Sequence, residues 1–217
     1  MHVQKIISHP VLENSYVLWT DKNQQALVVD PGLDPEAILS FLEEQNLELV
    51  GILCTHGHVD HIAGNGALKS KFPNAPILIG EGDAEMLTSP EKNLGVMFNL
   101  PIVSPPADQL LNEGDVVELA GLRFRILFVP GHSAGHIAFL ADVDEANHLF
   151  GGDVILPPAI GRTDFPGGDM DTLLASIREK FFTLPDDTIL YPGHYEVTTI
   201  GDQKQNNQVV GIHAGWQ

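Results

Sequence analysis

Short runs of hydrophobic residues alternate with polar segments over the first thirty positions of the chain. This pattern is typical of an antiparallel meander, in which each apolar run is a strand and each polar segment a turn. Asp34 and Pro35 then precede apolar residues at helical spacing, which predicts a helix capped by Asp34 and ending near Asn46. The predicted strands are 3–8, 16–20 and 26–29, with a hairpin turn at 21–25.

A continuous apolar run at 49–54 predicts a buried strand, because a strand covered on both faces shows no alternation. The polar sequence THGHVDH begins where this run ends, so its histidines are expected at the carboxyl end of a strand. The segment 89–115 contains four prolines and little periodicity, which predicts a long surface loop. The other predicted elements are helices at 62–72, from 81 and at 171–182, and strands at 77–79, 116–119, 123–128, 137–141, 148–150 and 188–191.

Each half of this pattern runs from strands to helices, which predicts two sheets packed against each other with helices outside. The length of 217 residues and the hydrophobic share of 43% suit one domain with a sizeable core. No linker divides the chain, so residues 1–217 are predicted to form a single α+β domain.

Charge and cysteine content narrow the possible partners. With 11 Lys and Arg against 29 Asp and Glu, the formal charge of −18 argues against nucleic-acid binding, which depends on cations at phosphates. The one cysteine, Cys54, cannot form an internal disulfide. The N-terminus has no apolar signal region and no run of 18 apolar residues occurs, so we expect a cytoplasmic protein without membrane association.

Imidazole and carboxylate side chains follow four of the predicted strands. Seven such donors exceed the needs of one tetrahedral site, which favours two divalent ions that share a bridging carboxylate. The same donor types suit zinc, iron and manganese. The candidate ligands are His56, His58, Asp60, His61, His132, Asp153 and His194.

The segments that carry these donors are THGHVDH at 55–61, PGHSAGH at 130–136, GGD at 151–153 and PGH at 192–194. In this order, and across nearly the whole chain, they resemble the signature of the metallo-β-lactamase superfamily. The resemblance implies an αββα four-layer sandwich with a dinuclear metal site at one edge of the two sheets.

Matching positions within that signature imply two ligand groups joined by one carboxylate. His56, His58 and His132 would bind one ion, Asp60, His61 and His194 the other, and Asp153 would bridge them. Asp30, which ends the sequence VVD, matches a family position beside the ligands. The resemblance implies that Asp30 orients an imidazole from outside the ligand set.

A second resemblance concerns the substrate. The sequences GRTDFPGGD at 161–169 and FTLPDDTILYPGH at 182–194 resemble the single-domain glyoxalase II group, which hydrolyses S-acyl glutathione thioesters such as S-lactoylglutathione. This implies a small anionic, glutathione-linked substrate and a role in methylglyoxal detoxification. Only 23 residues follow His194, so we expect no C-terminal helical glutathione-binding domain. Arg162 and Tyr195 are the candidate substrate contacts.

Thioester chemistry suits the implied site. Two divalent ions lower the pKa of a bound water from about 16 toward about 7, which would give a bridging hydroxide held by Asp153 and Asp60. A thiol has a pKa of about 8.5, so the leaving thiolate needs no strong general acid. The prediction is a dinuclear metal-dependent thioester hydrolase of the glyoxalase II type.

Three other readings remain open at this point. A persulfide dioxygenase shares the HxHxDH motif and the GRTDF loop but uses a single iron, which would lie on His56, His132 and Asp153. A lactonase or β-lactamase would direct the same hydroxide at a cyclic substrate, and the lack of an export signal weighs against the β-lactamase. A non-catalytic metal scaffold ranks last, because no flavin module follows. Oxygen uptake, metal stoichiometry and thioester cleavage discriminate among these readings.

Overall fold

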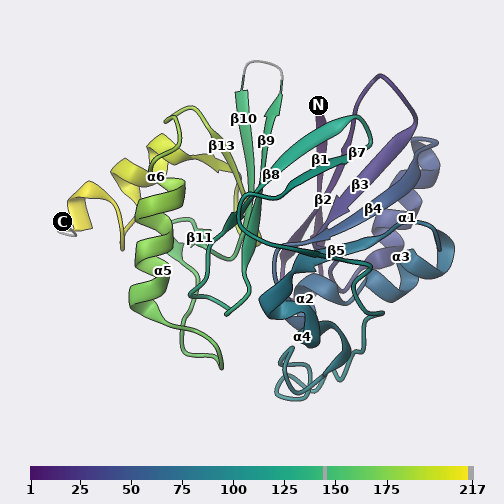
Figure 1. Ribbon diagram of the computed structural model, residues 1–217, viewed down its shortest axis with the longest axis horizontal. Helices are drawn as coiled ribbons and strands as arrows, with labels where there is room; N and C mark the ends of the chain where they lie inside the picture. Colours follow the sequence, from purple (N-terminus) through teal and green to yellow (C-terminus); the bar gives the residue numbers. More distant parts are fainter. Residues whose placement is uncertain (144–145, 215–217) are drawn as a thin grey trace.

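Two six-stranded sheets face each other and carry helices on their outer faces (Figure 1). The structure is a computed structural model that describes residues 1–143 and 146–214. Helices α1 (Pro35–Glu44) and α3 (Asn65–Lys71) cover one sheet, and α5 (Met170–Ser176) and α6 (Ile200–Asn206) cover the other. The α+β sandwich expected from the sequence is thereby confirmed.

The first sheet begins as an antiparallel meander and continues as parallel strands. Strands β1 to β3 pair antiparallel, and β3 to β6 pair parallel, in the order β1-β2-β3-β4-β5-β6. Because β3 and β4 are parallel, the residues that follow both strands emerge at the same edge of the sheet. The strands are β1 (His2–Ser8), β2 (Glu13–Trp19), β3 (Gln25–Val29), β4 (Glu48–Cys54), β5 (Ile77–Gly80) and β6 (Gln109–Leu111).

The second sheet has the order β14-β13-β10-β9-β8-β7. Its one parallel pair is β10 with β13, in which Gly152 lies opposite Pro192. Asp153 and His194, which follow these strands, therefore leave the sheet at a common edge. The strands are β7 (Val116–Leu119), β8 (Leu122–Phe128), β9 (Ile137–Val143), β10 (Ala146–Gly152), β13 (Ile189–Pro192) and β14 (Thr198–Thr199).

Short elements complete the described part of the chain. They are α2 (Val59–Ile62), the 3-10 turn Glu81–Asp83, α4 (Ala84–Thr88), β11 (Ile155–Leu156), β12 (Ala159–Ile160), the π turn Ile177–Phe181 and the 3-10 turn Ile212–Ala214. Within the described residues, no helix is both long enough and apolar enough to cross a bilayer.

Three sequence-based predictions of local structure need correction. The helix expected at 62–72 is split, because Gly64 donates its N–H to Pro31 O at 2.7 Å and a Cβ at Gly64 would lie 2.9 Å from Gly32 O. The loop expected at 89–115 contains strand β6. Asp34 precedes α1 but makes no side-chain cap; instead its N–H donates to Ser8 Oγ at 3.2 Å.

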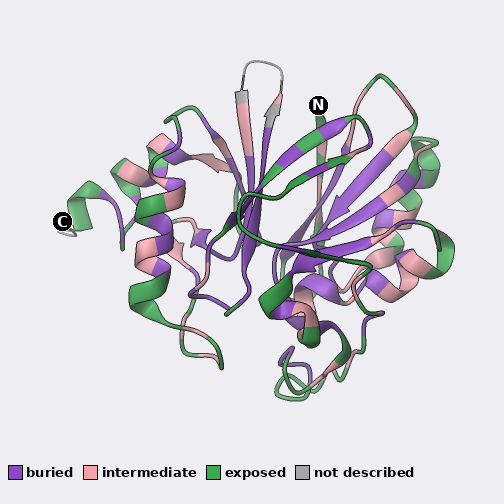
Figure 2. Cartoon of the chain, in the orientation of Figure 1, coloured by how far each residue is buried: buried purple, intermediate pink, exposed green. Residues whose placement is uncertain are grey.

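The main hydrophobic core lies between the two sheets, where β2, β3 and β4 are almost entirely buried (Figure 2). Phe150 of β10 is fully buried there, and its ring stacks on Tyr191 of β13 with centroids 4.6 Å apart. Tyr16 of β2 meets both rings edge to face, at 5.7 Å from Phe150 and 5.4 Å from Tyr191. Aromatic packing thus joins the two sheets directly behind the strand ends that carry Asp153 and His194.

Candidate metal centre

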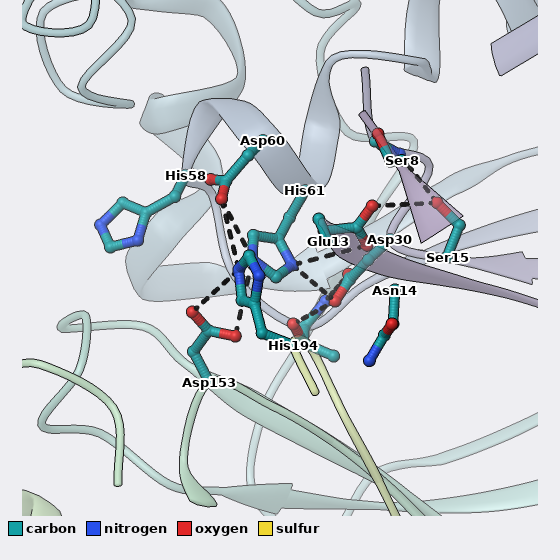
Figure 3. Close-up of polar contacts among 12 residues, drawn as sticks. Ser8, Glu13, Asn14, Ser15, Asp30, His58, Asp60, His61, Asp153 and His194 are labelled. Atoms are coloured by element: carbon teal, nitrogen blue, oxygen red, sulfur yellow. Dashed lines mark hydrogen bonds and ion pairs between the residues drawn. The ribbon is translucent and has the colours of Figure 1, made fainter. Parts of the chain in front are cut away.

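The loop after β4 is held in place by two hydrogen bonds from its first residue, Thr55. Thr55 donates both its N–H and its hydroxyl to the Asp30 carboxylate, at 2.7 and 2.6 Å. Asp30 follows the parallel neighbour β3, so this contact joins two adjacent strand ends. The chain then turns into α2, and Figure 3 shows Asp60 and His61 of this segment directed toward His194 and Asp153.

Three imidazoles form the first donor group. His58 Nδ1 lies 3.0 Å from His56 Nε2 and 3.0 Å from His132 Nε2. All three residues are buried, and the rings meet nearly at right angles, with interplanar angles of 82° to 87°. Three ring nitrogens that converge in this way place their lone pairs around a common point, which suits a cation.

A second donor group lies beside the first. Asp60 Oδ2 is 3.4 Å from His194 Nε2 and 3.8 Å from His61 Nε2. The Asp153 carboxylate lies between the groups: Oδ1 is 3.6 Å from His61 Nε2, and Oδ2 is 3.6 Å from His132 Nε2 and 3.7 Å from His194 Nε2 (Figure 3). The structure therefore brings all seven candidate ligands together.

Two atoms at the centre of this cluster lack hydrogen-bond partners. His61 Nε2 and Asp153 Oδ1 are both buried and make no hydrogen bond, although they lie 3.6 Å from each other. Buried polar atoms in folded proteins are nearly always paired, so such atoms need an explanation. Carboxylate and imidazole donors aimed at a shared space fit divalent metal ions. We conclude that these histidine and aspartate clusters are suited to binding metal ions.

The charge states of the side chains favour a cation. Burial, with the neighbouring His132, lowers the pKa of His58 to about 3, so its ring is neutral and its nitrogen lone pair is free. Burial acts to raise the pKa of Asp153, but His61, His194 and His132 together outweigh burial and hold this pKa well below its usual value. Burial acts to lower the pKa of His61, yet Asp153, Asp60 and Asp30 raise it well above the usual range, so these carboxylates stabilise positive charge in the cluster. The ionised carboxylates give the site its negative charge.

In His61 and His132, the ring nitrogen that faces away from the cluster has a fixed partner. His61 Nδ1 lies 3.1 Å from Asp30 Oδ2, and His132 Nδ1 lies 2.8 Å from Arg162 O. A partner on one ring nitrogen sets the tautomer and leaves the other nitrogen free for a metal. The geometry at Asp30 is the one expected of a residue that orients an imidazole.

Asp83 is a supporting residue that the sequence analysis missed. Its carboxylate is buried; Oδ1 accepts a hydrogen bond from Gly135 N at 2.6 Å, while Oδ2 accepts from Ser133 Oγ at 2.6 Å and Gly57 N at 3.2 Å. Asp83 therefore ties the HxHxDH loop to the PGHSAGH loop. A lone acid in the sequence EGDAE gives no signal of this role, because its partners are distant in sequence.

Replacing Asp83 with asparagine is expected to lower the free energy of unfolding by about 2 kcal/mol or more, since the new amide directs N–H groups at the existing donors. Urea denaturation of the metal-loaded protein measures this loss. The exposed Asp187→Asn variant is the matched control and should unfold like the wild type. An Asp83→Asn protein as stable as that control would contradict the role of the carboxylate as a link between loops.

Asn14 at the start of β2 holds the loop that presents His194. Its N–H donates to Gly193 O at 2.7 Å, and its side-chain amide donates to Pro192 O at 3.0 Å and Tyr195 O at 2.8 Å. Tyr195 has a φ of 69°, a left-handed conformation that these contacts help to maintain. The sequence analysis missed Asn14 as well, because it lies far from every ligand motif.

A cavity of about 590 Å³ opens over the donor groups. Both candidate substrate contacts line it, and Tyr195 is 62% exposed at its edge. The Arg162 guanidinium, however, makes two hydrogen bonds to Asp164, at 2.6 and 2.7 Å, and lies 3.8 Å from the centre of the Phe165 ring. Arg162 thus reaches the cavity with its charge already paired.

Fold and site together define a metal-binding αββα sandwich whose donors gather at one edge of its two sheets. The chain belongs to the metallo-β-lactamase superfamily: the sequence profile of that family matches residues 10–194. This confirms the resemblance inferred from the four sequence motifs.

Individual proteins of known sequence or structure are similar over nearly the full chain. The protein is 38% identical over 210 residues to hydroxyacylglutathione hydrolase GloC of Haemophilus influenzae, covering 95% of this chain and 97% of that protein. The crystal structure of BLEG-1 B3 metallo-beta-lactamase matches with a TM-score of 0.91 at 35% identity and covers 96% and 99% of the two chains. TTHA1623, crystallised in a di-iron-bound form, matches with a TM-score of 0.80 at 31% identity, covering 94% and 98%.

Proposed function

We propose that the protein is a dinuclear metal-dependent thioester hydrolase of the glyoxalase II type, which cleaves S-lactoylglutathione or a related S-acyl glutathione to the hydroxy acid and glutathione. One observation carries the proposal: the Asp153 carboxylate lies within 3.6 Å of an imidazole from each donor group. The similarity to a relative named hydroxyacylglutathione hydrolase supports the substrate class.

The proposed ligands follow the two donor groups. His56, His58 and His132 would hold one ion, Asp60, His61 and His194 the second, and Asp153 would contact both. Zinc, iron and manganese all suit this mixture of imidazole and carboxylate. The di-iron form of TTHA1623 supports a count of two ions.

When bound, two divalent ions supply a water activated near neutral pH and an electrophile for the substrate carbonyl. The chain itself orients the groups around the reaction. Asp30 fixes the ring of His61, and the Arg162 carbonyl fixes that of His132. Phe165, whose ring lies 5.8 Å from that of His58, keeps water from one side of the cavity. The departing thiolate is the conjugate base of a thiol with a pKa of about 8.5, so it needs no proton donor.

Hydrolysis of S-lactoylglutathione by metal-quantified protein tests the proposal. We expect two metal equivalents per chain, loss of activity after chelation and its return when the metal is restored. The His58→Ala variant removes one proposed ligand and should lower turnover strongly, whereas Asp187→Asn should not. A protein that carries two ions and cleaves no S-acyl glutathione would refute this function.

A β-lactam or lactone hydrolase is the second candidate, favoured by the TM-score of 0.91 to BLEG-1 B3 metallo-beta-lactamase. The same site would then act on a cyclic amide or ester. A chromogenic cephalosporin and a simple γ-lactone, assayed beside the thioester on one protein preparation, rank these substrates directly. Oxygen consumption with glutathione persulfide in the same series tests the mononuclear iron alternative.

A further inference from the structure

Apolar side chains line much of the cavity over the metal centre, and we refer to them as the apolar wall. The Phe165 ring lies 5.8 Å from the His58 ring, and the Phe98 ring lies 5.9 Å from Phe165. The wall consists of Val11, Leu94, Phe98, Leu100, Ile160 and Phe165. Phe98 and Val11 line the cavity yet remain 50% and 42% exposed. Apolar surface left open beside a site usually marks a surface that binds.

Two polar side chains that line the cavity beside the wall, Arg162 and Asn93, are engaged within the protein. Arg162 is the one lysine or arginine that lines the cavity in the described part of the chain, and Asp164 neutralises it. The Asn93 amide donates to Ile102 O at 3.0 Å and accepts from Gly95 N at 2.8 Å. Apart from the metal-binding donors, the wall therefore presents mainly apolar groups.

We propose that this wall binds the acyl group of the substrate, and that the site prefers S-acyl glutathiones with an apolar acyl chain, such as hexanoyl, over the small polar lactoyl group. The inference rests on the proposed thioester hydrolysis and narrows its substrate class. Apolar chains gain binding free energy in proportion to the surface that they bury.

The chemistry of glutathione assigns the wall to the acyl side of the thioester. On the sulfur side of an S-acyl glutathione, a single methylene separates the sulfur from the peptide backbone of the cysteine. Amide and carboxylate groups placed against Phe165 and Phe98 would lose water without gaining partners. Only an apolar acyl chain can cover the surface that leads from His58 to Phe98.

Binding of inert thioethers tests the inference without chemistry. Calorimetric titration of metal-loaded protein compares S-methylglutathione with S-hexylglutathione, whose alkyl groups stand where the acyl group would be. If about half the surface of five added methylenes is buried, Kd falls about 30-fold across the pair. The Phe98→Ser variant should reduce this ratio to about 10-fold or less. Phe128→Ser removes an exposed phenylalanine outside the cavity and should keep the full ratio.

Turnover separates this inference from the function on which it rests. We expect kcat/KM for S-hexanoylglutathione to exceed that for S-lactoylglutathione by at least about 10-fold. Equal Kd values for the two thioethers, together with hydrolysis that favours the lactoyl substrate, would overturn the inference and leave thioester hydrolysis standing. If a protein with two bound ions cleaves neither thioester, the proposed function falls and the inference falls with it.

Discussion

Thioester turnover should fall by on the order of 10³-fold when Asp153 is replaced by asparagine. Mutating a residue that only contacts a metal ligand already lowers activity by about 10- to 100-fold, so the loss of a proposed ligand should lower it further. The substitution keeps the side-chain volume but removes the charge that both donor groups share. Asp153 Oδ1 faces His61 and Oδ2 faces His132 and His194, at 3.6 to 3.7 Å. Asp30 also lies within 4.8 Å of a histidine from each group, His56 and His61, but its Oδ2 faces the Nδ1 side of the His61 ring, 3.1 Å away.

Metal analysis and kinetics on the same Asp153→Asn sample measure the effect. The bound metal should fall from two equivalents toward one or none, with turnover falling in parallel. Asp187→Asn makes the same chemical change at an exposed position and controls for the loss of one negative charge. An Asp153→Asn protein that retains two ions and full activity would refute the shared-carboxylate assignment.

The largest expected effect on stability comes from Phe150→Ala in the core. Phe150 is fully buried, stacks on Tyr191 and meets Tyr16 edge to face, so its removal opens a cavity between the two sheets. A buried phenylalanine truncated to alanine costs about 3–5 kcal/mol of unfolding free energy. Because whole domains are stable by about 5–15 kcal/mol, this loss is a large share of the total.

Urea denaturation with metal present in excess measures this loss. Phe128→Ala truncates a phenylalanine that is 39% exposed and should cost well under half as much. If Phe150→Ala fails to fold, Phe150→Leu keeps most of the volume and should unfold at an intermediate denaturant concentration. Equal losses for Phe150→Ala and Phe128→Ala would contradict the placement of the main core between the sheets.

The sequence predicted the strands and the ligand cluster well for a physical reason. Apolar runs that must be buried on both faces are legible without any tertiary information, and the donors follow such runs directly, as His56 follows β4. Parallel neighbours then bring strand ends to one edge, which is how Asp30 comes to lie beside His61. Local pattern therefore predicted two packed sheets and the placement of the candidate ligands after strands, whereas their division into two groups came from the resemblance to the superfamily.

Residues whose roles depend on distant partners were not predictable in this way. The break of the helix at Gly64 depends on the backbone of Pro31 and Gly32, and the role of Asp83 depends on Gly57 and Gly135. Neither set of contacts leaves a periodic trace in the sequence. The charge of a side chain likewise did not predict whether that charge is free or paired in the cavity.

Arg162 illustrates that limit. As a cation in a motif it was a reasonable candidate for an anionic substrate, but Asp164, two residues later, binds its guanidinium at two points. The sequence GRTDF is compatible with an ion pair between Arg162 and Asp164 but does not single it out. The apolar wall was also hidden, because Phe98 and Phe165 are 67 positions apart in the chain and meet only in the folded protein.

The two donor groups each combine residues from both sheets. In the first group, His56 and His58 follow β4 of the first sheet, whereas His132 follows β8 of the second. In the second group, Asp60 and His61 also lie in the segment after β4, whereas His194 follows β13 of the second sheet. Neither group is complete until both sheets have formed and docked. During synthesis, the chain can therefore assemble the second group only after residue 194 has left the ribosome, so this donor group is completed late in folding.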